Sequence, residues 1–220
     1  MAVIEAFLFD LDGTLMDSEM LYVEAVKLAL ADQGCYLNQA ESVELVYGKG
    51  WKNIFLEASA LFPTAYADID SMGVVVRRHF CELKAERDIR IPGSIDLLRD
   101  LARSYPVAVA SGSLRREIAE AIEYLDIGSC VEFYLGADDY FPGKPDPTCY
   151  EAAARKLGLQ PEQCLVFEDS SAGVLAAKRA GMFCVALQRD GVPGQDLTPA
   201  DAICGDLSEF KLDDLLEMAS

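Results

Sequence analysis

The sequence has few basic residues, no long apolar run and no basic leader, and each absence excludes a class of protein. Its 220 residues contain 19 Lys and Arg against 37 Asp and Glu, a formal net charge of −18. No local basic patch offsets this charge, so we expect no nucleic-acid partner. The apolar run from Ala6 to Phe9 stops at Asp10, which is too short for a signal core or a membrane span. We therefore expect a cytoplasmic protein that binds no membrane.

The cysteines form no CxxC pair, and their number is odd. Zinc sites and disulfide frameworks need paired spacings, and most of these cysteines lie in apolar stretches. We expect buried, reduced thiols rather than ligands or bridges. The seven are Cys35, Cys81, Cys130, Cys149, Cys164, Cys184 and Cys204.

Short β-type runs alternate with segments of helical periodicity along most of the chain. This alternation is typical of a parallel sheet with crossover helices, so the predicted fold is α/β with a Rossmann-like core. The expected strands are Ile4–Phe9, Pro106–Ala110, Phe133–Leu135, Cys164–Phe167, Phe183–Leu187 and Ala202–Cys204. The expected helices of this core are Ser94–Ser104, Ser113–Leu125, Pro147–Leu157, Ser171–Ala180 and Ser208–Met218.

One stretch lacks strands altogether. Between about Ser18 and Asp88 the pattern is helical only, with expected helices at 18–33, 51–62 and 66–87. We therefore predict a core formed by residues 1–16 and 90–220 and an inserted helical domain at 17–89. Because the insert follows the first strand, we expect it to cover the carboxyl ends of the strands, where open α/β sheets bind ligands.

Two of the expected strands end in acidic pairs. Asp10 and Asp12 follow the first strand, and Glu168 and Asp169 follow Cys164–Phe167. Taken alone, the first pair is compatible with an Asx-type turn and the second with a helix N-cap at Asp169. Four carboxylates at one sheet edge would repel one another, however, unless a cation lay between them. A hard divalent ion with oxygen ligands, Mg²⁺, satisfies that requirement.

Two further loops offer groups that can hold an anion. Ser111-Gly112-Ser113 follows the strand Pro106–Ala110 and opens a helix, where a hydroxyl and backbone N–H groups can receive an anion. An ordinary turn is the alternative for this segment. Lys144 lies among three prolines, so it is either an exposed lysine or one held rigidly over the acidic edge, where it could bind a phosphoryl group.

Together these segments resemble the signature loops of the haloacid dehalogenase superfamily, in its β-phosphoglucomutase-like branch with a small helical cap. The four loops are Asp10-Leu11-Asp12-Gly13-Thr14, Ser111, Lys144 and Glu168-Asp169. Their order and spacing match along nearly the whole chain. The resemblance implies a phosphoric monoester hydrolase that binds a small phosphorylated metabolite and works as a monomer.

The resemblance also implies a role for each residue. Asp10 would be the nucleophile that forms an aspartyl-phosphate, and Asp12 the general acid and base. Mg²⁺ would be held by Asp10, the backbone carbonyl of Asp12, and Asp169, with Glu168 as a direct or indirect ligand. The expected phosphate-binding groups are Ser111, the N–H of Gly112, and Lys144.

Dehalogenases of the superfamily lack an acid at the position of Asp12, so phosphoryl transfer is favoured. Phosphomutases of the branch carry a cap-hinge histidine and an arginine where this chain has Tyr22 and Trp51, and its only histidine is His79. We therefore expect water as the acceptor, and a sugar or sugar-acid phosphate as substrate. Candidate specificity residues are Lys49, Trp51 and Tyr22. A hexose phosphate mutase and a non-catalytic phosphate-binding or regulatory module are the alternatives.

Overall fold

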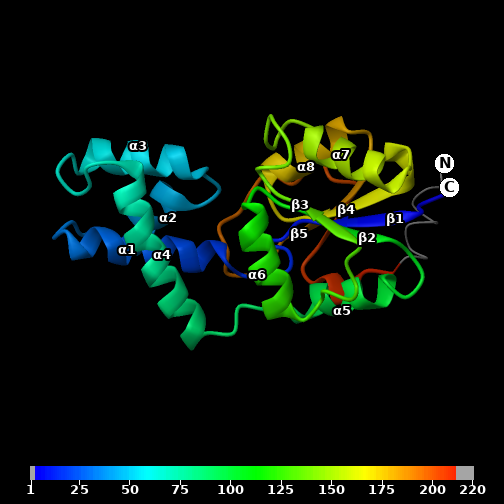
Figure 1. Ribbon diagram of the computed structural model, residues 1–220, viewed down its shortest axis with the longest axis horizontal. Coiled ribbons are helices and arrows are strands. Elements are labelled where there is room, and N and C mark those ends of the chain that lie inside the picture. The colour runs from blue at the N-terminus through cyan, green and yellow to red at the C-terminus, as the bar shows by residue number, and fades with distance from the viewer. Residues whose placement is uncertain (1–2, 212–220) are drawn as a thin grey trace. The chain divides into compact units, whose positions relative to one another are not determined.

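The computed structural model describes residues 3–211 and consists of two compact units (Figure 1). One unit contains the chain up to Met16 together with the chain from Arg90 onward, and the other spans Asp17–Ile89. The first unit contains the strands of the sheet, and the second is entirely helical. None of the helices in the described residues is long and apolar enough to cross a membrane.

The first unit is built on a six-stranded sheet of order β3-β2-β1-β4-β5-β6, in which every pair of neighbours is parallel. The predicted parallel α/β fold is therefore confirmed. The strands are β1 (Ala6–Phe9), β2 (Val107–Ala110), β3 (Phe133–Leu135), β4 (Cys164–Glu168), β5 (Phe183–Leu187) and β6 (Ala202–Cys204). Five strands begin and end within one residue of the expected bounds, and β1 begins two residues later than expected.

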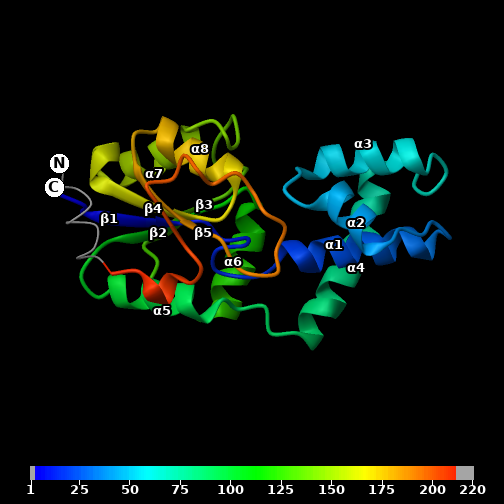
Figure 2. The same cartoon turned by 180° about the vertical axis from the view of Figure 1, so that it is seen from behind.

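Helices cover both faces of this sheet, α7 and α8 on one and α5 and α6 on the other (Figures 1 and 2). Their bounds are α5 (Pro92–Leu101), α6 (Arg115–Leu125), α7 (Thr148–Leu157) and α8 (Ser171–Arg179), with 3₁₀ turns at η1 (Pro161–Gln163) and η2 (Leu207–Glu209). Of the helix expected over 208–218, the described residues show only the 3₁₀ turn η2, and residues 212–220 lie outside the described part of the chain.

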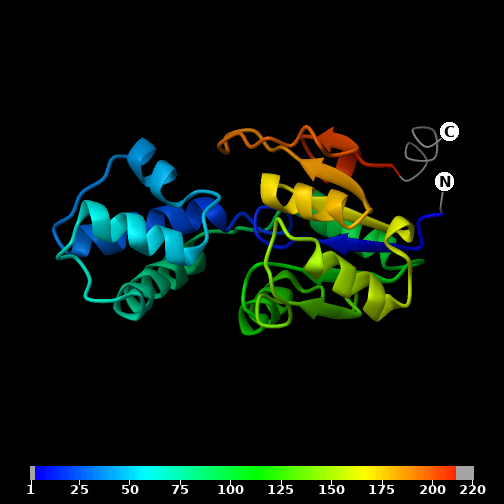
Figure 3. The same ribbon diagram turned by 90° about the horizontal axis from the view of Figure 1, so that it is seen from above.

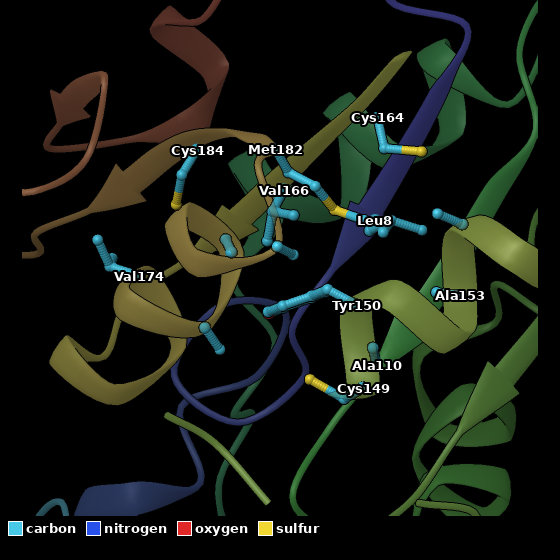
Figure 4. Packing of buried hydrophobic residues seen from close by; sticks show 14 of the residues in the cluster. Leu8, Ala110, Cys149, Tyr150, Ala153, Cys164, Val166, Val174, Met182 and Cys184 are labelled. Atoms are coloured by element: carbon cyan, nitrogen blue, oxygen red, sulfur yellow. The ribbon is translucent and has the colours of Figure 1, made fainter. Parts of the chain in front are cut away.

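The two faces of the sheet carry different side chains because strand residues alternate between them. The face under α7 and α8 is lined mostly by small residues such as Ala110, Cys164 and Cys184 (Figure 4). These leave room for the Tyr150 side chain of α7, which is completely buried. On the opposite face Phe9 stacks on Phe167, with ring centroids 4.5 Å apart. Aromatic packing there therefore joins the ends of β1 and β4.

The second unit contains four helices that pack against one another (Figure 3). They are α1 (Glu19–Asp32), α2 (Gln39–Val46), α3 (Trp51–Leu61) and α4 (Ile69–Glu86). Three were expected from the sequence, and α2 was missed. Its start is marked by a capping box, in which the side chain of Asn38 accepts from the N–H of Glu41 and that of Glu41 accepts from the N–H of Asn38.

All seven cysteines are free, as expected, but they are not all buried. Cys149, Cys164 and Cys184 lie in the core between the sheet and its helices. Cys81 on α4 is exposed and Cys35, Cys130 and Cys204 are half-buried, so the prediction of burial was wrong for these four.

Candidate active site

The predicted acidic residues gather where β1 and β4 end. These strands are neighbours in the sheet, with Phe9 paired to Phe167, and the N–H of Asp10 donates to the carbonyl of Phe167 at 2.9 Å. Carboxylate oxygens of Asp10, Glu168 and Asp169 consequently lie within 4.8 Å of one another. All three side chains are at least nine-tenths buried. Adjacent strand ends thus bring together three acids that are far apart in sequence.

The Glu168 carboxylate is held by protein donors on both of its oxygens. Oε2 accepts from the backbone N–H groups of Asp169 and Ser170 at 3.0 and 3.1 Å, and from the Ser170 hydroxyl at 2.9 Å. Oε1 accepts from Lys144 Nζ at 2.6 Å and from the Tyr150 hydroxyl at 2.8 Å. With these five bonds, Glu168 fixes the orientation of the groups around it.

Lys144 is a buried residue that reaches into the same acidic group. Its Nζ donates to Asp10 Oδ1 at 2.6 Å and to the carbonyl of Ala110 at 3.0 Å, in addition to its bond with Glu168. Its side chain is only 10% exposed. Of the two alternatives open from the sequence, the exposed lysine is therefore excluded. One ammonium group therefore offsets two carboxylates.

Burial and mutual charge change the pKa of each member of this group. Burial is the largest effect at Asp10 and raises its pKa well above the usual value, although Lys144 acts in the opposite direction. At Glu168 burial is opposed by Lys144 and by hydrogen bonds from Ser170 and Tyr150, which together hold its pKa below the ordinary value. Burial would lower the pKa of Lys144, but the charges of Asp10 and Glu168 raise it well above its usual range. Lys144 is therefore a permanent cation.

The side chain of Asp12 is turned toward the loop after β2. Its Oδ2 accepts from the Ser111 hydroxyl at 3.2 Å and from the Ser113 hydroxyl at 2.7 Å. Gly112 lies exposed between these serines, and no heavy atom beyond its chain neighbours lies within 4 Å of where a Cβ would be. The backbone can therefore approach a ligand closely at this point.

Gly13, Thr14 and Asp169 form a tight contact between the loop after β1 and the loop after β4. The Thr14 hydroxyl donates to Asp169 Oδ1 at 3.2 Å. Gly13 has a φ of +90°, and a Cβ on it would lie 2.0 Å from Asp169 Oδ2. Ser170, whose side chain accepts from the N–H of Gly173, is the N-cap of α8. The alternative role for Asp169 as that cap is therefore wrong, and its carboxylate faces the site.

No functional role was predicted for Tyr150, Ser170 or Tyr140, and Ser113 was singled out only as part of its loop. The Tyr140 hydroxyl donates to the carbonyl of Ser111 at 2.8 Å and so braces the loop after β2. Tyr150 looks like one apolar position of a helix, and only its burial beside Glu168 reveals its polar contact. Ser170 is the exception, because a serine directly before a helical pattern signals an N-cap.

The three expected specificity residues lie in the helical unit. Tyr22 and Trp51 are in edge-to-face contact, with ring centroids 6.2 Å apart, and Tyr22 also packs on Phe80. Lys49 pairs with Glu57, with Nζ 2.6 Å from Oε2. These residues are therefore brought into one region of their unit, and Lys49 has an anionic neighbour of its own.

His79, the single histidine, belongs to a different cluster in this unit. Its Nε2 lies 2.8 Å from Asp32 Oδ2, which also accepts from Arg78 at 2.6 Å. This ring is engaged in the packing of α1 against α4.

Known proteins similar to this chain are hydrolases and phosphatases. The family model for haloacid dehalogenase-like hydrolases matches residues 4–181. Validoxylamine A 7′-phosphate phosphatase of Streptomyces hygroscopicus subsp. limoneus is 32% identical over 93% of this chain and 94% of its own length. The phosphorylated carbohydrates phosphatase of Thermotoga maritima is 31% identical over 81% of this chain and 82% of its own.

A solved structure shows the same likeness in three dimensions. CbbY from Rhodobacter sphaeroides, crystallised in complex with phosphate, superposes with a TM-score of 0.76 at 26% identity. The match covers 94% of this chain and 96% of that one. On the strength of the matched family model and of phosphatase relatives aligned over most of their length, the chain belongs to the haloacid dehalogenase-like hydrolases.

Proposed function

We propose that this hydrolase is a Mg²⁺-dependent phosphatase that removes the phosphoryl group of a small metabolite, a sugar or sugar-acid phosphate, through an aspartyl-phosphate. The observation that carries the proposal is the placement of Lys144 between Asp10 and Glu168, beside Asp169. The names of the relatives support the substrate class, since they include phosphatases of phosphorylated carbohydrates and of fructose 1-phosphate.

Asp10 is the proposed nucleophile. One of its carboxylate oxygens attacks phosphorus, a P–O bond to aspartate forms, and the bond to the leaving oxygen breaks with its electron pair. Lys144, 2.6 Å from Asp10 Oδ1, favours the ionised carboxylate despite its burial. The neighbouring carboxylates repel anions, so a negatively charged phosphoryl group binds here only where positive charge offsets them.

Asp12 is the proposed general acid and base. It gives its proton to the leaving oxygen in the first step and then takes a proton from the water that attacks the aspartyl-phosphate. That second attack breaks the bond between phosphorus and the Asp10 oxygen, releases inorganic phosphate and restores both carboxyl groups. The hydrogen bonds from Ser111 and Ser113 would hold the Asp12 carboxyl group in place for this role.

The donor set fits a hard divalent cation. Asp10 and Asp169 would offer carboxylate oxygens and Asp12 its backbone carbonyl, which is oxygen chemistry suited to Mg²⁺. When bound, Mg²⁺ would neutralise charge on the transferring phosphoryl group. Glu168, whose oxygens already accept five hydrogen bonds, would act indirectly by fixing Lys144 and the backbone at Asp169.

The remaining phosphoryl oxygens would be bound by Ser111, the N–H of Gly112, and Lys144. The helical unit would serve as a cap that selects the leaving group. Within it Tyr22, Lys49 and Trp51 are the proposed specificity residues, and Glu57 would keep Lys49 oriented until an anionic or hydroxylated substrate competes for it. We further propose that the enzyme is a cytoplasmic monomer.

The test is phosphate release from a panel of phosphorylated metabolites, with and without Mg²⁺, using Asp10→Asn as the matched control. We expect selective turnover that requires Mg²⁺ and falls by roughly 10⁴-fold or more in Asp10→Asn. Isomerisation of a hexose 1-phosphate in the presence of a bisphosphate primer, without phosphate release, would instead indicate a mutase. Silence in both assays would overturn the enzymatic proposal in favour of a binding role.

A further inference from the structure

We propose that Ser113 is the positioning residue of Asp12, and that it retains the acid–base carboxyl group when Ser111 turns its hydroxyl to the phosphoryl group. This inference rests on the proposed function. It assigns to the two serines of one loop different tasks: Ser111 binds the group that is transferred, and Ser113 orients the group that protonates the leaving oxygen.

Both serine hydroxyls point to the same oxygen of Asp12. Ser113 Oγ lies 2.7 Å from Asp12 Oδ2 and Ser111 Oγ 3.2 Å from it. Hydroxyl-to-carboxylate bonds are strongest at the shorter of these distances, so the contact with Ser113 is the better bond. It joins residues 101 positions apart in the chain, across the ends of two neighbouring strands.

The number of hydrogens that the Ser111 hydroxyl can donate separates the roles of Ser111 and Ser113. A serine hydroxyl has a single hydrogen to donate. Ser111 Oγ gives that hydrogen to Asp12 here, and it also accepts from the N–H of Ser113 at 3.0 Å. To donate to a phosphoryl oxygen, Ser111 must release Asp12. Ser113 can keep its bond to the carboxyl group while Ser111 does so.

Hydrogen bonds hold both the N–H and the carbonyl of Ser113, so the position from which its hydroxyl reaches Asp12 is fixed. Its N–H is bonded to Ser111 Oγ, and its carbonyl accepts from the N–H of Ala137 at 2.9 Å. The next residue but one, Arg115, begins α6 and donates its N–H to Asp138 at 2.8 Å. The loop after β2 is therefore tied to the loop after β3, and Ser113 can orient Asp12 without moving itself.

Leaving groups differ in how much they depend on this orientation. When the P–O bond of an alkyl phosphate breaks, the electron pair stays on an oxygen that must receive the Asp12 proton to leave. A nitrophenolate oxygen delocalises the same pair and can leave without that proton. A residue that acts by orienting Asp12 should therefore matter for the alkyl ester and much less for the aryl ester.

The experiment compares kcat/KM of Ser113→Ala, Ser113→Thr and Ser111→Ala for two substrates. These are the best alkyl phosphate from the metabolite panel and p-nitrophenyl phosphate. The ratio kcat/KM is used because it reports the steps up to formation of the aspartyl-phosphate, before Asp12 is needed for hydrolysis of that intermediate.

We expect Ser113→Ala to lower kcat/KM for the alkyl ester at least about tenfold more than for p-nitrophenyl phosphate, which is the size of a modest general acid–base effect. Ser113→Thr, which keeps the hydroxyl, should restore most of the difference. Ser111→Ala should lower both values by similar factors because both substrates carry the same phosphoryl group.

Equal losses for the two substrates in Ser113→Ala, or no loss in either, would overturn the inference while leaving the phosphatase proposal intact. Wild-type protein that hydrolyses neither substrate would overturn both. Circular dichroism and the thermal midpoint of each variant show whether a loss of activity is caused by misfolding. If Ser113→Ala misfolds, the substrate dependence of kcat/KM is compared between the wild type and Ser113→Thr instead.

Discussion

The ammonium group of Lys144 lies 2.6 Å from Oε1 of Glu168, a carboxylate with no exposed surface. Removing one partner of a buried ion pair leaves the other charge without compensation, and that is costly. Here the same nitrogen also serves Asp10, so two buried acids depend on one cation.

We therefore expect Lys144→Met to abolish turnover and to lower the free energy of unfolding by about 3 to 5 kcal/mol near pH 7. Urea denaturation followed by circular dichroism measures the second effect. Lys156→Met is the control, because Lys156 on α7 is an exposed lysine that contacts the Phe133 ring. This substitution should change the free energy of unfolding by no more than about 1 kcal/mol. Equal stability of the two variants would show that the acids do not rely on Lys144.

A second prediction concerns the glycine that lies against Glu168. A Cβ at Gly173 would lie 1.7 Å from Glu168 Oε1, and the carboxylate is too firmly bonded to move freely. We expect Gly173→Ala to reduce stability by about 1 to 3 kcal/mol, despite the better helix propensity of alanine, and to reduce activity.

Gly194→Ala provides the matched control for that substitution. No heavy atom outside its chain neighbours lies within 4 Å of a Cβ at Gly194. Its thermal midpoint and turnover should stay close to those of the wild type. A Gly173→Ala protein as stable and active as this control would contradict the close approach of α8 to Glu168.

The third prediction separates the acids by their effect on metal dependence. Asp169→Asn should raise the Mg²⁺ concentration for half-maximal turnover by roughly 10- to 100-fold, because a proposed ligand loses its charge. Glu168→Gln should act chiefly on stability, since Glu168 is bonded to Lys144, Tyr150 and Ser170. Asp190→Asn, at an exposed position, is the control. A larger Mg²⁺ requirement in Glu168→Gln than in Asp169→Asn would reverse the proposed roles.

A fourth prediction uses the thiols. Burial is the main reason that the pKa of Cys149 and that of Cys164 are raised to about 11. Because only the thiolate is alkylated, and a raised pKa means less thiolate at a given pH, both should resist iodoacetamide at pH 8. Cys81, which is exposed, should react first. Mass spectrometry of the native and the guanidinium-unfolded protein reports each site. Native labelling of Cys149 as fast as of Cys81 would refute its burial.

Local patterns in the sequence were sufficient for the framework of the site. Strands that end in acids, serine or a proline-flanked lysine are visible as short apolar runs followed by polar residues, and parallel strands present those ends at one edge. The parallel sheet with its crossover helices followed from the alternation of strand and helix patterns. By contrast, α2 was missed because its eight residues, Gln39–Val46, show little apolar periodicity, and only the capping box at Asn38 and Glu41 marks it.

The contacts that tune the site could not be predicted because they join distant segments. Nothing near Tyr150 in the sequence indicates that its hydroxyl meets Glu168, and nothing near Ser113 indicates that it faces Asp12. Such pairs depend on strand register and on the approach of helices to the sheet, which small residues on that face permit. A sequence pattern specifies which residue types are present, whereas these distances are set by packing.

The position of β1 between β2 and β4 has a consequence for how the enzyme loses its activity. Interior strands exchange their amide hydrogens only when the whole domain opens. The amide hydrogen of Asp10 is itself bonded to the carbonyl of Phe167, at 2.9 Å, and so belongs to this slowest class. The site should therefore disappear in the same cooperative transition as the fold, and a form that has kept its sheet while its reactive aspartate is exposed to solvent should not accumulate.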